Sequence, residues 1–188
     1  DMFFQEETSY TTKTFIEKNN IAILPVGAVE AHGPHLPLGT DNYLAEEVSK
    51  KVASQSNAFV LPTLPYGQVW SLKNFPGSIN VSNESLISMV ADIGESLVRQ
   101  GVETFVLMNG HLGNQNALKD AARVLFEKAP ELKVYYFFYP GMNDVVNEVK
   151  ETSKVHGSYF HACEIETSYM LYLKKDKVDM DKAINDTP

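Results

Sequence analysis

The chain has 188 residues, of which 44% are hydrophobic and 21% charged, and its formal net charge is -8. This length and balance suit one well-buried globular domain and exclude an intrinsically disordered protein. The negative charge, with no local cluster of lysine and arginine, argues against a surface that binds nucleic acid or acidic lipid.

Compartment and membrane association can be judged from the cysteine count and the apolar runs. The one cysteine, Cys163, permits no internal disulfide, which suits a reducing compartment. No apolar run approaches a membrane span, and the first residues lack the basic region of a signal peptide. We therefore expect a cytoplasmic protein that binds neither membrane nor nucleic acid.

Runs of apolar, β-branched and aromatic residues predict four strands. The runs show no clean polar alternation, which is typical of parallel strands covered on both faces. They are Ile21 to Val26, Ala58 to Leu61, Glu103 to Met108, and Lys133 to Tyr139.

Helical patterns lie between and after these strands, over Asp41 to Ser54, Asn83 to Gln100, Asn114 to Lys128 and His161 to Lys174. The first can be capped by Thr40 or Asp41, and the second ends at Gly101, a good helix stop. The alternation predicts an α/β fold, a three-layer helix-sheet-helix sandwich with a mostly parallel central sheet.

Two long segments indicate functional loops. Pro62 to Ser82 is rich in proline and glycine and carries Trp70 and Phe75, whereas Pro140 to Phe160 is polar, with an early part compatible with a short helix. In α/β proteins, long loops at strand ends commonly carry the binding groups.

Metal donors follow two of the predicted strands. Glu30, His32, His35 and Asp41 come after the first strand, and His111 comes after the third. Carboxylate and imidazole ligands without thiolates suit Zn²⁺, Mn²⁺ or Fe²⁺. Because the carboxyl ends of parallel strands share one edge of the sheet, we expect the two segments to meet there.

A third histidine segment contains His156 and His161, close to Glu164 and Glu166. Each donor taken singly has a simpler interpretation. Capping a helix is enough to explain Asp41, and turn formation is enough to explain the glycines. Three histidine segments, two of them at strand ends, favour a metal site over turn chemistry alone. His32 and His35 have helical spacing, but the glycine and prolines around them indicate an irregular loop.

Four segments resemble the motifs of the creatininase (creatinine amidohydrolase) family. Leu24 to Asp41 is similar to the family signature, Asn109 to Asn114 to its second motif, and His161 to Ser168 to its third. Phe75 to Ile79 resembles a further family segment. The segments occur in the family's order, and the resemblance implies an α/β sandwich with two divalent metal ions, usually assembled as a hexamer.

The resemblance also implies a set of ligands. By the matching positions, Glu30, Asp41 and His111 hold one ion, while His32 and the bridging Asp41 hold the other. Zn²⁺ is the expected metal, with Mn²⁺ or Fe²⁺ as alternatives. Some members complete the second ion with a glutamate two residues after the histidine of the second motif, where this chain has Gly113.

We expect Glu164 of the third motif to supply the remaining ligand. If that motif opens a helix, His161 and Glu164 lie three residues apart on one face, and Glu166 points elsewhere. His161 and Glu164 are therefore the predicted catalytic residues, with His161 giving a proton to the departing nitrogen. His35 is expected to organise the loop rather than to bind metal.

The reaction implied is metal-assisted hydrolysis of a C–N bond in a small cyclic amide, formamide or related substrate, with the cations polarising the carbonyl and supplying hydroxide. The family's known reactions include creatinine ring opening, formamide removal and peptide cleavage, and the resemblance does not choose among them. A non-catalytic metal-binding or assembly protein on the same scaffold is the alternative. The expected organisation is one creatininase-like domain over residues 1–188, either a short member or one lacking a C-terminal segment.

Overall fold

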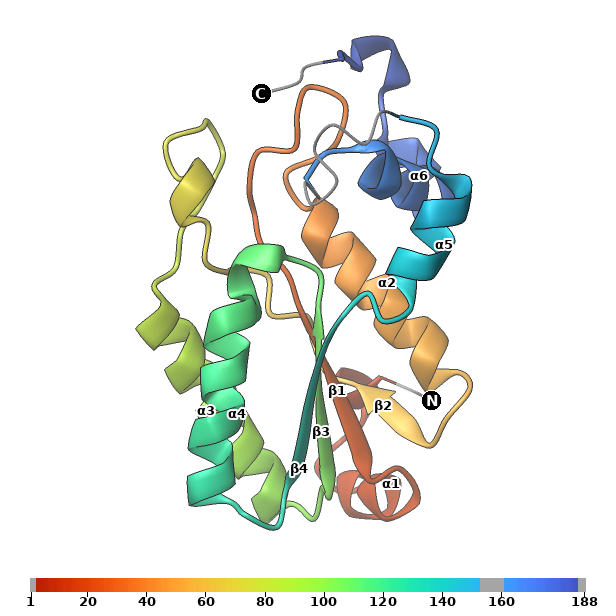
Figure 1. Cartoon of the computed structure of the whole chain (residues 1–188). Coiled ribbons are helices and arrows are strands. Elements are labelled where there is room, and N and C mark those ends of the chain that lie inside the picture. Colours follow the sequence, from red (N-terminus) through yellow and green to blue (C-terminus); the bar gives the residue numbers. More distant parts are fainter. Residues whose placement is uncertain (1–2, 153–160, 186–188) are drawn as a thin grey trace.

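The central sheet has four strands, all parallel, in the order β2-β1-β3-β4 (Figure 1). The structure is a computed structural model that describes residues 3–152 and 161–185. Each strand lies within one or two residues of its predicted position. The strands are β1 (Ile21–Val26), β2 (Ala58–Val60), β3 (Thr104–Asn109) and β4 (Lys133–Phe138).

The helices alternate with the strands as predicted, with one addition near the N-terminus and a short helix, α5, in the polar segment after β4. They are α1 (Thr12–Lys18), α2 (Thr40–Ala53), α3 (Asn83–Arg99), α4 (Gln115–Lys128), α5 (Met142–Val149) and α6 (Glu164–Leu173). Short 3-10 turns lie at Phe4–Glu6, Trp70–Leu72, Leu112–Asn114, Lys175–Lys177 and Met180–Lys182. Within the described ranges, no helix has the length and apolar character needed to cross a bilayer.

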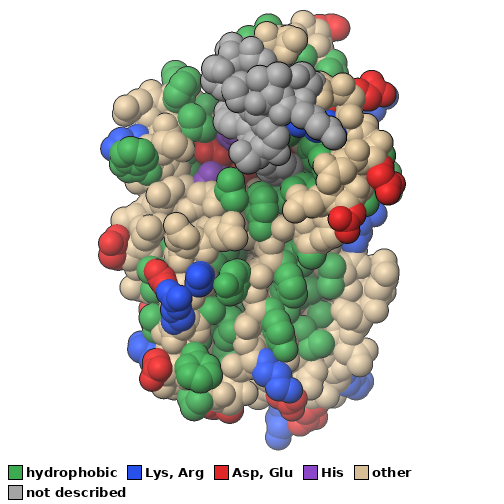
Figure 2. Space-filling view, viewed as in Figure 1, with side chains coloured by type: hydrophobic (Ala, Val, Ile, Leu, Met, Phe, Trp, Pro, Cys, Tyr) green, Lys and Arg blue, Asp and Glu red, His purple; other side chains and the backbone are tan. Residues whose placement is uncertain are grey.

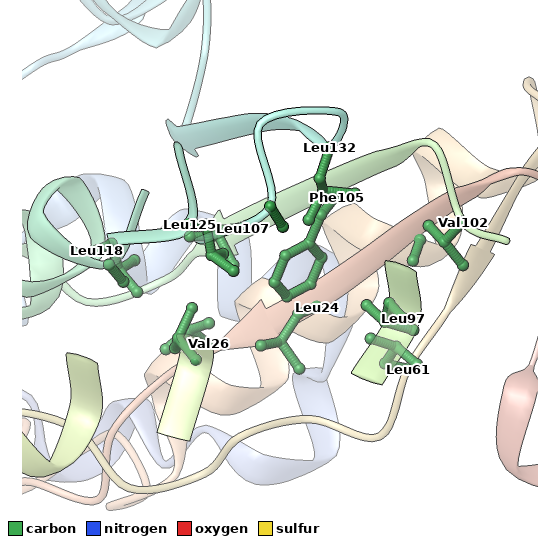
Figure 3. Close-up of a cluster of buried hydrophobic side chains, with 14 of the residues drawn as sticks. Leu24, Val26, Leu61, Leu97, Val102, Phe105, Leu107, Leu118, Leu125 and Leu132 are labelled. Carbon is green, nitrogen blue, oxygen red and sulfur yellow. The ribbon is translucent and has the colours of Figure 1, made fainter. Parts of the chain in front are cut away.

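Helices cover the sheet on both sides, α3 and α4 on one face and α2 on the other (Figure 1). Successive residues of β1 point to opposite faces: Leu24 belongs to the cluster under α3 and α4, and Ile23 to the cluster beside α2. In β3, Phe105 and Leu107 join Leu24 in the larger cluster (Figure 3). Both faces of β1 and β2 are buried, which explains why these strands lack polar alternation. The expectation of strands covered on both faces is wrong for the edge strand β4, where Tyr135, Tyr136 and Phe137 are exposed.

A third apolar cluster holds α6 against α2 beyond the carboxyl end of the sheet. Leu44 of α2 and Met170 of α6 are fully buried in it, together with Leu36 and Tyr139. This packing brings the C-terminal part of the chain beside the loop that follows β1.

The start of α2 differs from the expectation for a capped helix. Neither Thr40 nor Asp41 caps it, because the helix begins at Thr40 and the residue before it is Gly39. The Thr40 hydroxyl donates to the Pro37 carbonyl at 2.7 Å, and Asp41 lies buried in the first turn. The Asp41 carboxylate is therefore engaged in something other than capping.

Candidate metal centre

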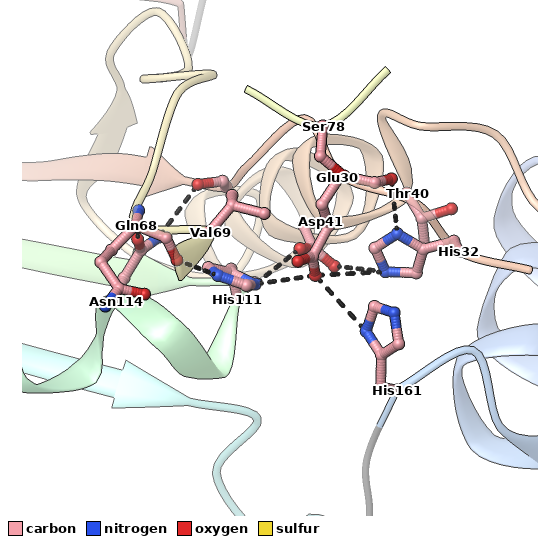
Figure 4. A network of polar contacts seen from close by, with 12 residues as sticks. Glu30, His32, Thr40, Asp41, Gln68, Val69, Ser78, His111, Asn114 and His161 are labelled. Atoms are coloured by element: carbon pink, nitrogen blue, oxygen red, sulfur yellow. Dashed lines mark hydrogen bonds and ion pairs between the residues drawn. The ribbon is translucent and has the colours of Figure 1, made fainter. Parts of the chain in front are cut away.

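The carboxyl ends of β1 and β3 bring the two strand-end donor segments together. The strands are paired in register up to Val26 and Asn109, and the Gly110 N–H donates to the Val26 carbonyl at 2.8 Å. A side chain at Gly110 would collide with the Asp41 carbonyl, so glycine lets the first turn of α2 approach the end of β3. The segments that contain Glu30, Asp41 and His111 therefore converge at one edge of the sheet (Figure 4).

The Asp41 carboxylate lies between two imidazoles. Its Oδ1 is 3.0 Å from His32 Nε2, and its Oδ2 is 2.9 Å from His111 Nδ1. His111 Nδ1 is also 3.0 Å from Glu30 Oε1. Glu30, His32 and Asp41 are each about 1% exposed, so these three side chains are shielded from bulk solvent. Because each Asp41 oxygen faces a different histidine, the carboxylate has the arrangement that a bridging ligand requires.

His161 approaches the same group from the turn before α6. Its Nδ1 is 3.4 Å from Glu30 Oε1, and its ring centroid is 4.4 Å from that of His32. The His161 side chain is 21% exposed, compared with 10% for His111 and 0% for His32. In the space-filling view, histidine atoms lie beside acidic ones in the upper part of the molecule, above a largely hydrophobic surface (Figure 2). His161 is thus the imidazole best placed to meet a molecule from solvent.

Each of the three imidazoles has one ring nitrogen next to a backbone carbonyl. A carbonyl oxygen can only accept a hydrogen bond, so that nitrogen must carry the proton, and in a neutral ring the other nitrogen presents its lone pair to the carboxylates. The pairs are His32 Nδ1 with Glu30 O (3.1 Å), His111 Nε2 with Gln68 O (2.6 Å) and His161 Nε2 with Ala31 O (2.8 Å).

The buried carboxylates make this region attract positive charge. Burial disfavours the His32 imidazolium, but the contacts with Asp41 and Glu166 outweigh burial and raise the pKa of His32 to about 11. Burial likewise opposes charge on His111, while Asp41 and Glu30 raise its pKa to about 10. Burial acts to raise the pKa of Asp41, yet hydrogen bonds from His111 and His32 lower it to about 2.

The donor set fits divalent metal. His32 Nε2 and Asp41 Oδ2 are buried, and in the described part of the chain they have close contacts, to Asp41 Oδ1 and His111 Nδ1, rather than well-aligned hydrogen bonds; a cation can accept a lone pair from each. Imidazole and carboxylate donors are those of zinc and manganese sites. Three trios offer ligand atoms within 4.8 Å of one another: Glu30 with Asp41 and His111, His32 with Asp41 and Glu166, and Glu30 with His32 and His161.

The structure brings Glu166, not Glu164, to this cluster. α6 begins at Glu164, so His161 lies before the helix, and the intervening Ala162 has a left-handed φ of 48°. The helical spacing expected for His161 and Glu164 therefore does not apply. Instead, the Glu164 carboxylate accepts from the backbone N–H groups of Glu151 and Thr152 at 2.9 and 2.8 Å.

Glu166 takes the place that we expected for Glu164. It is 2% exposed, its Oε1 lies 3.7 Å from His32 Nε2, and its Oε2 accepts a hydrogen bond from the Ala162 N–H. His35, expected to organise the loop, lies apart from the cluster, with Nε2 2.9 Å from Thr167 Oγ1. His156 and the end of the predicted loop Pro140 to Phe160 fall in 153–160, outside the described residues.

Two residues outside the predicted ligand set support His111. Gln68 provides the carbonyl that accepts from His111 Nε2, and the Asn114 side chain accepts from the Gln68 N–H at 2.9 Å and donates to the Gly27 carbonyl at 2.9 Å. A Cβ at Gly113 would collide with His111 Nε2 and lie 2.5 Å from the Gln68 carbonyl. Glycine at this position therefore leaves room for the carbonyl that orients His111.

The chain is similar in sequence to one family of known proteins. The family model described as Creatininase: Creatinine amidohydrolase matches residues 5–188. The creatinine amidohydrolase of Pseudomonas putida is 30% identical over 181 residues, covering 89% of this chain and 70% of the relative. The 3-dehydro-scyllo-inosose hydrolase of Thermotoga maritima is 24% identical, covering 100% of this chain and 61% of the relative.

The mycofactocin precursor peptide peptidase of Mycolicibacterium smegmatis is 28% identical, covering 87% of this chain and 62% of the relative. This chain thus spans between 61% and 70% of the length of these three relatives.

Solved structures agree over the whole chain. A crystal structure of creatinine amidohydrolase (creatininase) has a TM-score of 0.89 at 28% identity, covering 100% of this chain and 78% of that one. A structure described as creatininase Mn has a TM-score of 0.85 at 29% identity, with coverages of 100% and 79%. A mutant creatininase of Zn-Zn type has a TM-score of 0.79 at 29% identity, with coverages of 100% and 78%.

Proposed function

The chain belongs to the creatininase family, and from that premise we propose that it is a metal-dependent amidohydrolase acting on a C–N bond of a small cyclic amide, formamide or related substrate. One observation carries the proposal. Three imidazoles, each with one nitrogen bonded to a backbone carbonyl, turn the other nitrogen toward buried carboxylates. Such an arrangement preorganises His32 and His111 as ligands, because the carbonyl selects the tautomer whose free nitrogen faces the carboxylates.

The proposed site holds two divalent ions. Glu30, Asp41 and His111 would bind one, and His32, Asp41 and Glu166 the other, with Asp41 as the bridge. Zn²⁺ is the proposed metal and Mn²⁺ the alternative, which is supported by creatininase structures described by each of these metals. Glu166 thus replaces Glu164 in the proposed ligand set.

Divalent ions, when bound, supply polarisation of the scissile carbonyl and activation of water near neutral pH. The chain's own residues hold the donors in place before substrate arrives. Glu30 and Asp41 are shielded from water, which strengthens their attraction for positive charge. The backbone carbonyls of Glu30 and Gln68 fix the rings of His32 and His111, so little reorganisation is needed during the reaction.

His161 is the proposed general acid. Its Nε2–H is bonded to the Ala31 carbonyl, so Nδ1 is the nitrogen that holds and transfers a proton on the side of the cluster. The greater exposure of His161 gives it access to a leaving nitrogen, whereas the enclosed His32 has none. General acid catalysis of this kind contributes about 10² to 10⁴ in rate.

The substrate is best sought by direct assay, because the named relatives act on different molecules. The protein would be loaded with Zn²⁺ or Mn²⁺, its metal content measured by mass spectrometry, and hydrolysis followed on creatinine, lactams, formamides and a short peptide. We expect two metal ions per chain and turnover of a small cyclic amide or formamide that chelation abolishes and added metal restores. Two bound ions without turnover would favour the non-catalytic alternative, and a protein that binds no metal would refute the proposal.

The variant His161→Ala separates the role of acid from that of ligand. As a general acid, His161 can be removed with the metal content unchanged and kcat lowered roughly 10² to 10⁴-fold. Loss of one ion from this variant would instead assign His161 to the trio with Glu30 and His32.

A further inference from the structure

His35 joins the loop after β1 to helix α6. The residue is 8% exposed, and its Nε2 lies 2.9 Å from Thr167 Oγ1, a contact between residues 132 positions apart. The backbone carbonyl of His35 also accepts from the Asp179 N–H at 3.0 Å, beyond the end of α6. The loop that carries His32 and Asp41 is therefore tied to the segment that carries Glu166 through a residue that is itself outside the cluster.

Glu166 needs such a tie because it does not come from the sheet. α6 packs on α2 through Leu44 and Met170, which sets the face of α6 that turns toward α2, but the hydrophobic effect is non-directional and does not fix the rotation finely. A hydrogen bond has a preferred length and angle, so the contact between His35 and Thr167 can set that rotation. Thr167 is the residue next to Glu166, and any rotation that moves its hydroxyl moves the neighbouring carboxylate.

Among the described residues, the Thr167 hydroxyl is the hydrogen-bond partner of the His35 ring. Its Nδ1 is buried without a hydrogen-bond partner in residues 3–152 and 161–185, so the Thr167 hydroxyl is the contact that fixes the side chain. At the Glu166 carboxylate, the Ala162 N–H donates to Oε2, and Oε1 is turned toward His32. Glu166 is thus held directly by the Ala162 N–H on one oxygen. It is held indirectly by the hydrogen bond between His35 and the adjacent residue Thr167.

We propose that His35, through Thr167, is a positioning residue for Glu166 that sets the affinity of the metal site formed by His32, Asp41 and Glu166. The inference rests on the proposed function, since it assumes that the cluster binds metal. The site formed by Glu30, Asp41 and His111 is not affected, because strands β1 and β3 and helix α2 position those ligands.

The variant Thr167→Val tests this proposal, because it removes the hydroxyl and keeps the shape. Metal-free protein would be titrated with Zn²⁺ against a chelating dye to obtain two stepwise dissociation constants, and Glu166→Gln would identify which of them belongs to the site with Glu166. We expect Thr167→Val to weaken that site about 10 to 100-fold and to leave the other unchanged, as for the loss of an outer contact. Thr167→Ser retains the hydroxyl and should restore wild-type affinity.

A matched control and a second variant keep the result interpretable. Ser49→Ala also removes a buried hydroxyl, bonded to the Ala45 carbonyl within α2, and should leave both affinities unchanged. His35→Phe keeps an aromatic ring without its nitrogens and should reproduce the selective loss if Thr167→Val does not fold. In the background of Glu166→Gln, Thr167→Val should have no further effect on metal binding, because the two act on one site.

Equal weakening of both sites, or no weakening of either, would overturn the inference and leave His35 a purely structural residue. A wild-type protein that binds no zinc would overturn the proposed function together with it. Two intact sites in both the wild type and Thr167→Val would overturn the inference alone.

Discussion

The two halves of the cluster are built by different parts of the fold. In the strand half, Glu30 and His111 follow β1 and β3, whose backbone hydrogen bonds hold the two strand ends side by side. In the helix half, Glu166 comes from α6 and meets His32 through side-chain contacts between distant segments. Strand pairing thus places side chains at the strand ends directly. A side chain on a packed helix depends instead on individual side-chain contacts for its position.

Asp41 belongs to both halves, so its removal is expected to have the largest effect. Asp41→Ala should lower the metal content from two ions to none. It should also reduce kcat/KM roughly a thousandfold or more, which corresponds to about 4 kcal/mol of activation free energy. Metal analysis and steady-state assays measure the two effects. Asp120→Ala, which removes an exposed aspartate paired with Arg123 on α4, is the control and should leave both unchanged. Retention of both ions in Asp41→Ala would break the idea of a shared ligand.

Two glutamates of α6 differ in whether they reach the helix half of the cluster. Glu166→Gln should remove one ion and lower activity about a hundredfold, since it replaces the charged carboxylate of a proposed ligand with a neutral amide. Glu164→Gln, a matched change on the same helix, should retain both ions, because the Glu164 carboxylate binds backbone N–H groups of the segment before it. Metal content measured side by side decides between them. The opposite result would return Glu164 to the ligand set.

Gly113→Ala should produce a smaller effect that is confined to the strand half. The added Cβ would push the Gln68 carbonyl away from His111 and disturb the orientation of that ring. We expect the affinity of the site with Glu30, Asp41 and His111 to fall about 10 to 100-fold, as for other losses of an outer hydrogen bond, with the helix half unchanged. Stepwise zinc titration gives this measurement.

The control for this change is Gly141→Ala. Gly141 also has little tolerance for a side chain, because its φ is 80°, but a Cβ there has no neighbour within 4 Å. This variant should lose about 1 to 2 kcal/mol of folding stability through backbone strain and keep both metal affinities. If the strand-half affinity falls equally in both glycine variants, the effect of Gly113→Ala reflects general destabilisation and not the contact with His111.

Much of the fold follows from local patterns. Strands β1, β2 and β3 are largely buried and read as apolar runs, so they and the helices between them lie close to their predicted positions. The aromatic run of β4 also predicts its position, although its residues are largely exposed. Helix α1 was missed, since it has seven residues and buries only Phe15 and Ile16. So short a segment offers too few turns for a helical period to be recognised.

The helix half shows where reasoning from spacing fails. The prediction of Glu164 assumed that the third motif opens a helix at His161, but Ala162 adopts a left-handed conformation and the helix starts three residues later. Gln68 was missed for another reason, because it contributes a backbone carbonyl. A carbonyl is present in every residue, so no residue type in the sequence marks it.

The order of residues is enough to predict the α/β class, the family, and the meeting of the segments with Glu30, Asp41 and His111, because the ends of paired parallel strands must share one edge. It does not specify which glutamate of α6 approaches them or which nitrogen of each histidine faces the cluster. Those choices depend on helix rotation and on backbone carbonyls from distant loops. Neither is encoded by the order of residues within a motif.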